Sequence, residues 1–375
     1  MTQIILYGII YVQLKNGVLL LSLSQSHLNR ILPILSDRQK SLHLIFRLLG
    51  PELQRSYSST SLLQKAPKAF IHGNPHLDNY VRTFNGSGMV DFDRSRIGPY
   101  CWDLIRLFSS FHICSKAFPN PLHPKIIHYT LKGYKNTFSN PHILYSEPSF
   151  LNRLQPKKHQ FTTKQYLRAQ KKWAGKLQRY QVPHDSPEIE DLLSLFLKSR
   201  KEKPILKFFQ IKKAARCNGS LGKEHILIYL EPKKQKQNRD GILIDIKETY
   251  CEKDTKLFYS PTDHQGLRMI QASNLYAPNI EQRLGHCTYN NIHYWGREVP
   301  AFNAKIKTLL LRRELEELGY SVGAQLGRAH RLSLLTTPSD LKKHLQQNDE
   351  HIVALAREMT QTVIDMRASL LKKHS

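Results

Sequence analysis

The fold of this chain is indicated by one stretch of sequence, Ile71-His72-Gly73-Asn74-Pro75-His76-Leu77-Asp78-Asn79, and by Val90-Asp91-Phe92-Asp93, which follows it after a short gap. The residues between them, 80–90, predict a hairpin that turns at Asn85-Gly86, because Asn-Gly is favoured in tight hairpin turns. Polar side chains therefore come directly before and directly after a predicted pair of short strands.

This spacing is typical of a phosphoryl-transfer site. Such a site needs a group that orients or deprotonates the acceptor hydroxyl, and oxygen ligands for magnesium on the nucleotide phosphates. Kinase catalytic loops place the base and an amide ligand five residues apart, then supply an Asp ligand after a hairpin. Asn74 and Asn79 have this separation, and Asp91 stands at the place of the second ligand. A polar turn between two strands is the alternative for this run taken alone.

Two further motifs belong to the same pattern. Gly98-Pro99-Tyr100-Cys101-Trp102-Asp103-Leu104 begins an apolar helix, and Asp103 is expected to cap that helix or to brace the catalytic loop. Asn218-Gly219-Ser220-Leu221-Gly222 lies between two predicted strands, and Lys247-Glu248 ends the next strand. A glycine-rich turn lets backbone N–H groups approach phosphates, which a strand lysine can also reach. The alternatives are a plain helix cap and a plain hairpin turn.

Together these motifs resemble those of the bacterial DUF2252 family, which is related to the protein kinase-like and aminoglycoside phosphotransferase-like fold. The resemblance extends over about residues 69–335, and its matching positions are Gly73, His76, Asn79, 91–93, 98–107, 219–222, Lys247-Glu248 and 326–330. It implies an α+β, protein kinase-like fold of two lobes, with a small antiparallel β lobe and a larger helical lobe. It also implies ATP and magnesium as cofactors, with a small-molecule acceptor.

The resemblance also implies roles for individual residues. Asn79 and Asp91 would hold the metal, and the catalytic positions would be Asn74, His76, Asp78 and Asp93. Gly219, Ser220, Gly222 and Lys247 would bind the nucleotide. Family members carry a helix glutamate that pairs with the strand lysine; Gln271 stands about there, and Glu281 is the alternative.

The chain departs from the family pattern in the order of its motifs and in some of the residues within them. The catalytic-loop motif precedes the glycine-rich turn, whereas Gly323 to His330 resembles the helix that normally leads into that loop, so the motif order predicts a circular permutation. The Asp of the family's catalytic loop is Asn74 here, and an amide cannot accept a proton. The Arg-Gly-rich segment that family members carry before the loop is not evident in residues 1–68.

Composition limits the partners. The chain carries 56 Lys and Arg against 30 Asp and Glu, a net charge of +26, which favours polyanions such as nucleotides or nucleic acid. Of this excess, +14 (21 − 7) lies in residues 151–236, where Tyr166, Trp173 and Tyr180 alternate with basic residues. Nucleic-acid binding by stacking is one interpretation of this segment. A solvated amphipathic helix with its aromatic residues facing the core is the other.

Five widely spaced cysteines without a C-x-x-C pair favour a reducing, cytoplasmic location over a disulfide framework. Two short apolar runs around Lys15-Asn16-Gly17 predict an N-terminal hairpin and no membrane span, with a targeting segment as the alternative. Strands are predicted at 208–215, 225–230 and 241–247, an extended piece at 293–299, and long helices from Ala304 onwards.

The expected organisation has four parts. They are an N-terminal hairpin with helices at 1–68, a helical lobe with the catalytic loop and the basic segment at 69–206, a β-rich nucleotide-binding lobe at 207–300, and helices at 301–375 that complete the helical lobe. Two functions remain open at this point. One is a kinase-like phosphotransferase whose activity is weakened or lost at Asn74, and the other is a non-catalytic pseudokinase or basic nucleic-acid-binding module.

Overall fold

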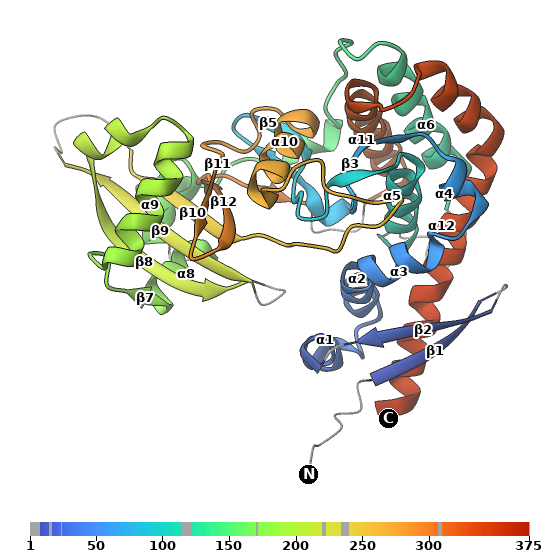
Figure 1. The fold of residues 1–375 in the computed structure, drawn as a ribbon, viewed down its shortest axis with the longest axis horizontal. Coiled ribbons are helices and arrows are strands. Elements are labelled where there is room, and N and C mark those ends of the chain that lie inside the picture. The colour runs from blue at the N-terminus through green and yellow to red at the C-terminus, as the bar shows by residue number, and fades with distance from the viewer. Residues whose placement is uncertain are drawn as a thin grey trace. The chain divides into compact units, whose positions relative to one another are not determined.

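The computed structural model describes residues 8–14, 17–23, 25–114, 122–169, 172–219, 223–233, 240–306 and 310–374 (Figure 1). The chain divides into two compact units. Residues 1–77, 98–146 and 307–375 form the helical unit, and residues 78–97 and 147–306 form the sheet unit.

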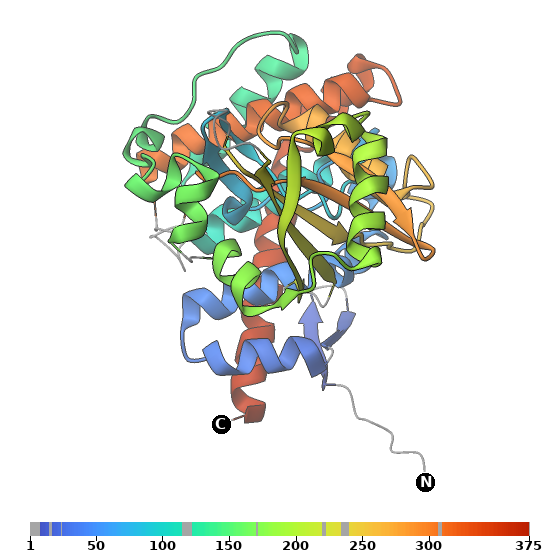
Figure 2. The ribbon, with the colours of Figure 1, turned by 90° about the vertical axis from the view of Figure 1, so that its left-hand side faces the viewer.

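The helical unit contains one hairpin at its start and long helices at its end. Its elements are β1 (Gly8–Leu14), β2 (Gly17–Leu23), α1 (Gln25–Ile31), η1 (Leu32–Ile34), α2 (Arg38–Leu48), α3 (Gly50–Tyr57), α4 (Ser61–Lys65), β3 (Lys68–Ile71), α5 (Cys101–Cys114), α6 (Pro124–Ser139), α11 (Arg312–Ser333) and α12 (Pro338–His374). Strands β1 and β2 pair antiparallel, which confirms the predicted hairpin, although Lys15 and Asn16 of its turn lie outside the described residues. Helix α12 packs against α2 and α5, as both views show (Figures 1 and 2).

Helices α6 and α11 approach each other so closely that their backbones touch. A Cβ atom on Gly323 of α11 would lie 2.1 Å from the carbonyl oxygen of Thr130, and one on Gly133 of α6 would lie 2.1 Å from that of Tyr320. No side chain fits at these contacts, so glycine is required by space and not by backbone conformation. This packing holds the C-terminal half of α11 against α6.

The sheet unit is built around an antiparallel sheet of six strands in the order β11-β12-β10-β9-β8-β7. Its elements are η2 (Leu77–Asn79, which begins in the helical unit), β4 (Tyr80–Thr83), β5 (Gly86–Met89), β6 (Arg96–Pro99, which ends in the helical unit), η3 (Ser149–Arg153), η4 (Lys158–Gln160), α7 (Thr163–Arg168), α8 (Trp173–Arg179), β7 (Gln181–Val182), α9 (Pro187–Ser199), η5 (Lys203–Lys207), β8 (Phe209–Asn218), β9 (Glu224–Pro232), β10 (Ile242–Glu248), α10 (Gln265–Tyr276), β11 (Gly285–Tyr289), β12 (Ile292–Glu298) and β13 (Ala304–Lys305). The predicted meander is confirmed by the antiparallel pairs β8–β9 and β9–β10, and the predicted hairpin at 80–90 by the pair β4–β5.

Alternate residues of the strands face two separate apolar clusters, as the pleat requires. On one face, Ile244 and Ile246 of β10 pack against α9 with Phe196. On the other face, Leu243 of β10 packs against Leu177 of α8. The sheet is thus covered on one face by α9 and on the other by α7 and α8.

Two expectations from the sequence need adjustment. The segment from Lys164 to Tyr180 forms two short helices, α7 and α8, instead of one, and Tyr166 is buried in the cluster under them. The predicted extended piece at 293–299 is confirmed as β12, but Ala304 begins the two-residue strand β13, so helix α11 starts only at Arg312. Among the described residues, no helix is both long enough and apolar enough to cross a bilayer.

Candidate functional site

Asp103 holds the start of the quoted loop in the helical unit. Its carboxylate accepts hydrogen bonds from the backbone N–H of His72 at 2.7 Å and from that of Gly73 at 2.9 Å. Trp102, the preceding residue on α5, donates from Nε1 to the carbonyl oxygen of Gly73 at 2.9 Å. Gly73 has φ +81°, a conformation that favours glycine. Asp103 is therefore a brace of the loop, one of the two roles expected for it.

Helix α11 contributes a second layer to this brace. Nε2 of His330 lies 3.1 Å from Oδ2 of Asp103, and Nδ1 of His330 lies 2.9 Å from the hydroxyl of Tyr134 on α6. Because an ionised carboxylate only accepts, Nε2 carries the proton, and in the neutral ring Nδ1 accepts from Tyr134. All three side chains are buried. The close α6–α11 packing thus has a consequence for the loop, because it places Tyr134 and His330 in contact.

Asn74 is held by an arginine that the sequence analysis did not single out. Nη2 of Arg106 on α5 donates to Oδ1 of Asn74 and to the carbonyl oxygen of Phe46 at 3.2 Å. The guanidinium of Arg106 also lies 3.6 Å from the ring centroid of Phe46, and the side chain is fully buried. A buried guanidinium would favour a carboxylate at position 74, since opposite charge stabilises both groups. The signal in the sequence that could have identified Arg106 is its place in the motif at 98–107.

His76 is buried in the same unit, and the following residue, Leu77, donates from its backbone N–H to Oγ of Ser110 on α5 at 3.0 Å. The loop is thus attached to α5 at both of its ends. The remaining predicted residues, Asp78 onwards, belong to the sheet unit.

In the sheet unit, Asn79 and Asp91 are brought together by the hairpin β4–β5. The backbone N–H of Val90 donates to the carbonyl oxygen of Asn79 at 2.8 Å. Asp91 has φ +75°, a left-handed conformation that costs a non-glycine residue on the order of 1 kcal/mol. The side chain of Asn79 is 1% exposed, and among the described residues neither of its amide atoms has a hydrogen-bond partner. Asp78 lies beside it in η2 and is half-buried.

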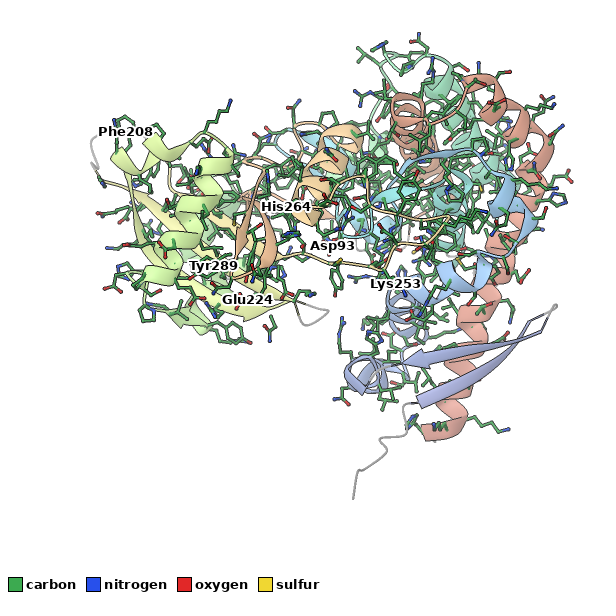
Figure 3. All side chains as sticks on the ribbon, in the orientation of Figure 1. Asp93, Phe208, Glu224, Lys253, His264 and Tyr289 are labelled. Carbon is green, nitrogen blue, oxygen red and sulfur yellow. The ribbon has the colours of Figure 1, made fainter. Side chains whose placement is uncertain are left out.

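Lys247 of β10 reaches the second carboxylate of the Asp-Phe-Asp run. Its Nζ lies 2.5 Å from Oδ2 of Asp93, which is labelled in Figure 3. Burial would lower the pKa of Lys247, but the carboxylates of Asp93 and Asp91 outweigh it and raise the pKa above its ordinary value. The ammonium group therefore stays charged and lies within the field of both aspartates.

The helix glutamate predicted as the partner of Lys247 does not have that role. Gln271 lies on α10, but the ion-pair partner of Lys247 is Asp93. Glu281 lies beyond the end of α10 and forms an ion pair with Arg297 of β12 at 2.5 Å. Burial raises the pKa of Glu281 above its ordinary value in spite of Arg297. The acidic partner of the strand lysine thus comes from the Asp-Phe-Asp run at 91–93 and not from the helix.

Arg268 of α10 holds the backbone of the segment that contains Asp93. Its guanidinium donates to the carbonyl oxygens of Asp93 at 3.1 Å and of Tyr250 at 3.2 Å, and also to that of Ser95. Burial lowers its pKa to about 10, which leaves it charged at neutral pH. Sequence reasoning missed Arg268, although an arginine between Leu267 and Met269 in an apolar helix is a signal of a buried polar contact.

The glycine-rich turn is described only at its edges. The backbone N–H of Gly219 donates to the carbonyl oxygen of Lys223 at 2.7 Å, which closes the turn between β8 and β9, whereas Ser220 and Gly222 lie outside the described residues. On β9, His225 is the cross-strand neighbour of Lys247. The turn therefore begins near Lys247 on the same sheet.

The donors of the sheet unit fit a hard divalent cation. Asn79, Asp91 and Asp93 offer amide and carboxylate oxygens, and Oδ1 of Asp93 is buried with no hydrogen-bond partner among the described residues. Within the same residues no cluster of three or more His, Cys, Asp or Glu side chains suits a metal ion. Two carboxylates and an amide nevertheless suit Mg²⁺, which usually takes one or two carboxylates, substrate phosphates and water.

Comparison with known proteins gives two matches. Residues 26–138 match the phosphotransferase enzyme family (APH), and residues 187–366 match DUF2252, an uncharacterised protein conserved in bacteria. No curated protein and no solved structure matches the chain. The first match contains the quoted loop, and the second contains Lys247 and His330. The two matches confirm the resemblance to DUF2252 and support, for this chain, a kinase-like α+β fold related to the phosphotransferase enzyme family.

Proposed function

We propose that the chain binds ATP with magnesium and transfers the terminal phosphoryl group to a small-molecule acceptor at a weakened rate. The observation that carries the proposal is the cluster of Lys247, Asp93 and Asp91, together with the side-chain amide of Asn79, which has no hydrogen-bond partner within the part of the chain that the structure describes. A buried amide such as that of Asn79 costs stability unless a ligand pairs with it, which favours a binding role over a structural one.

Each residue of the cluster has a role in the proposal. Asn79 and Asp91 would hold the metal, and Asp93 would keep Lys247 oriented until phosphates compete for its ammonium group. Arg268 holds the backbone carbonyl group of Asp93 by a hydrogen bond. The carboxylates therefore keep their positions while charge develops during phosphoryl transfer. When bound, magnesium neutralises charge on the phosphates. The glycine-rich turn from Gly219 to Gly222 would bind the nucleotide phosphates through its backbone N–H groups.

Asn74 stands at the acceptor-orienting position, and its amide explains the weakened rate. It can accept a hydrogen bond from an acceptor hydroxyl or donate one, but it cannot take the proton. His76 and Asp78 are the neighbouring catalytic positions, and the spacing of five residues between Asn74 and Asn79 supports this assignment. A non-catalytic pseudokinase is the alternative from the same site. A nucleic-acid module finds less support, because Tyr166 of the basic segment is buried.

We also propose that the fold is a circularly permuted kinase-like fold. Support comes from the end of α11, which lies beside the start of the strand that leads into the loop. The backbone N–H of Leu335 donates to the carbonyl oxygen of Lys68 at 3.0 Å, and the N–H of Phe70 donates to Oγ of Ser333 at 3.1 Å. A direct connection from α11 to β3 would restore the usual order of helix, strand and loop.

A thermal-shift measurement with ATP, with and without magnesium, tests the binding. A ligand at about 100 times its Kd adds about 2.7 kcal/mol of apparent stability. Asp91→Ala should remove the magnesium-dependent part of the shift, and Lys247→Met should remove most of the whole shift. Lys253→Met, at an exposed lysine labelled in Figure 3, is the matched control and should leave the shift unchanged. Absence of any shift with the unmodified chain would refute the proposal.

Asn74→Asp tests the catalytic part. The variant supplies a base beside Arg106 and should raise phosphoryl transfer or ATP hydrolysis by about 10²–10⁴-fold with little change in ATP affinity. Radiolabelled phosphate release and transfer to a panel of hydroxyl acceptors measure this. A folded variant that binds ATP with magnesium and stays inactive would favour the pseudokinase.

A further inference from the structure

The sheet unit contains a pocket on the face of the sheet opposite α9. It has a volume of about 340 Å³ and lies where α7 and α8 cross strands β8 and β9. This volume falls within the range of small-molecule sites. Its lining residues are Lys164, Leu167, Arg168, Ala174, Leu177, Gln178, Lys212, Lys213, Tyr229 and Glu231.

The floor of the pocket is apolar. Ala174 and Leu177 of α8 and Tyr229 of β9 belong to the buried cluster between the helices and the sheet, and Leu167 of α7 packs against it. An apolar floor favours a ligand that carries a hydrocarbon or aromatic group, since burial of such a group contributes roughly 25 cal/mol per Å².

The rim of the pocket is cationic, and a strand irregularity contributes to it. In β8, Ile211 pairs with Leu230 and Lys213 with Tyr229, so Lys212 is an extra residue in a β-bulge. In a regular strand, consecutive side chains point to opposite faces. A bulge re-aims one of them, and both Lys212 and Lys213 line the same pocket.

Two more cations come from α7. Lys164 and Arg168 are one turn apart, so they lie on the same side of the helix. Glu231 is the single acidic residue of the lining, and it lies 3.8 Å from Lys212. The lining therefore carries four cations and one carboxylate, a net charge of +3 (4 − 1). Among the described residues, no carboxylate lies within ion-pair distance of Lys164, Arg168 or Lys213.

A solvated basic surface is the plain alternative, because lysines commonly extend their stems over apolar surface. Three observations together favour a ligand site: a cavity of sufficient volume, a bulge that adds a second lysine, and three cations above an apolar floor, Lys164, Arg168 and Lys213, for which the described residues provide no acidic partner. We propose that this pocket binds a small soluble amphiphilic anion, with an apolar group on the floor and a phosphate or carboxylate among Lys164, Arg168 and Lys213.

This site is separate from the proposed nucleotide site. On β9, Tyr229 lies four residues beyond His225, the cross-strand neighbour of Lys247, which corresponds to about 13 Å along the strand. Helices α7 and α8 also lie between the two family matches, which end at residue 138 and begin again at residue 187. Binding at this pocket is therefore expected to be independent of ATP binding.

Isothermal titration calorimetry of the full chain with octyl phosphate tests the proposal. We expect one molecule to bind per chain, while octanol, inorganic phosphate and octyltrimethylammonium each bind at least about tenfold more weakly. If inorganic phosphate bound as tightly as octyl phosphate, the pocket would be only a basic surface, and the proposal would be refuted. Binding only to vesicles that contain phosphatidic acid, with none of free octyl phosphate, would indicate a lipid surface and would also overturn the proposal.

Variants locate the binding. Lys213→Gln and Arg168→Gln should each weaken octyl phosphate binding by about fivefold or more, since each removes a charge-assisted contact. Ala174→Leu should fill the floor and abolish binding, with circular dichroism as the check of folding. Lys198→Gln, at an exposed lysine of α9 on the opposite face, is the matched control. Lys247→Met should bind octyl phosphate normally, which separates this site from the nucleotide site. Equal affinity of Lys213→Gln, Arg168→Gln and Lys198→Gln would refute the assignment.

Discussion

The polar network around Asp103 in the helical unit is buried and the charged cluster around Lys247 in the sheet unit is half-buried, and the two differ in how many of their polar atoms have hydrogen-bond partners. Asp103 accepts from His72, Gly73 and His330. In the sheet unit, the amide of Asn79 and Oδ1 of Asp93 have no partner among the described residues. The first network stabilises the loop without a ligand, whereas the second carries a desolvation cost that a ligand would remove.

The largest effect is expected from loss of the brace. Asp103→Ala would leave two backbone N–H groups and the ring of His330 without their acceptor, and each such loss costs about 1–3 kcal/mol. We expect the free energy of unfolding of the helical unit to fall by about 3–5 kcal/mol.

Urea denaturation followed by circular dichroism measures this loss. Asp349→Ala is the control in the same unit, because the carboxylate of Asp349 forms a surface ion pair with the exposed Lys135 across 3.8 Å and accepts from the backbone N–H of its neighbour Glu350, and such a surface pair contributes about 0–1 kcal/mol. Equal losses in the two variants would show that Asp103 is not a brace.

A smaller effect, of the opposite sign, is expected in the sheet unit. Asn79→Leu replaces an amide without hydrogen bonds by an apolar group of similar size, so the free energy of unfolding should rise by about 0–2 kcal/mol. The same variant should lose the magnesium-dependent part of the ATP shift. Asn79→Asp keeps an oxygen ligand and should retain that part. A loss of stability above about 2 kcal/mol in Asn79→Leu would contradict a ligand role and indicate a structural one.

The smallest effect concerns His264, labelled in Figure 3, which caps α10. Its Nδ1 accepts hydrogen bonds from the backbone N–H groups of Gly266 and Leu267. Its ring stacks on the ring of His293, with 4.2 Å between the ring centroids, and contacts the ring of His286 edge-on, with 4.6 Å between the centroids. Burial, and then the charges of His293 and His286, lower the pKa of His264 to about 4. The unfolded chain therefore binds more protons between about pH 6.5 and 4, and the free energy of unfolding falls as the pH falls through this window.

His264→Asn removes this titration and keeps a side chain that can cap the helix. The difference in unfolding free energy between pH 7.5 and pH 5 should be smaller in the variant, by less than about 1 kcal/mol, because the half-exposed ring is screened by solvent. Urea denaturation at the two pH values measures it. An unchanged difference would mean that protonation of His264 does not affect the cap.

Several parts of the fold could be predicted from local sequence because the signal and the structure are both local. Short β-rich runs joined by turns predicted β8, β9 and β10, and Asn85-Gly86 predicted the β4–β5 turn. The brace by Asp103 was one of two roles open to it, since an Asp at a helix start can cap that helix or hold another loop. Long-range packing determines that Asp103 holds the loop at 72–73.

The partners of the site residues were not predictable in the same way. Lys247 and Asp93 are 154 positions apart, and family resemblance pointed to a helix glutamate that the chain does not use. Arg106 on Asn74 and Arg268 on the loop carbonyls depend on which helices pack behind the loop. Local periodicity contains no information on such pairs.

The sequence alone determined the chemistry of this protein: the oxygen donors Asn79, Asp91 and Asp93, the strand lysine, the amide at position 74 and the positive charge. Tertiary structure decided which of these groups meet and which stay without partners. It also decided that Lys212 and Lys213, identical neighbours in the chain, line one pocket, because a single extra residue in β8 changes the direction of a side chain. The physical reason is that residue type sets what a group can bind, whereas burial and geometry set what it does bind.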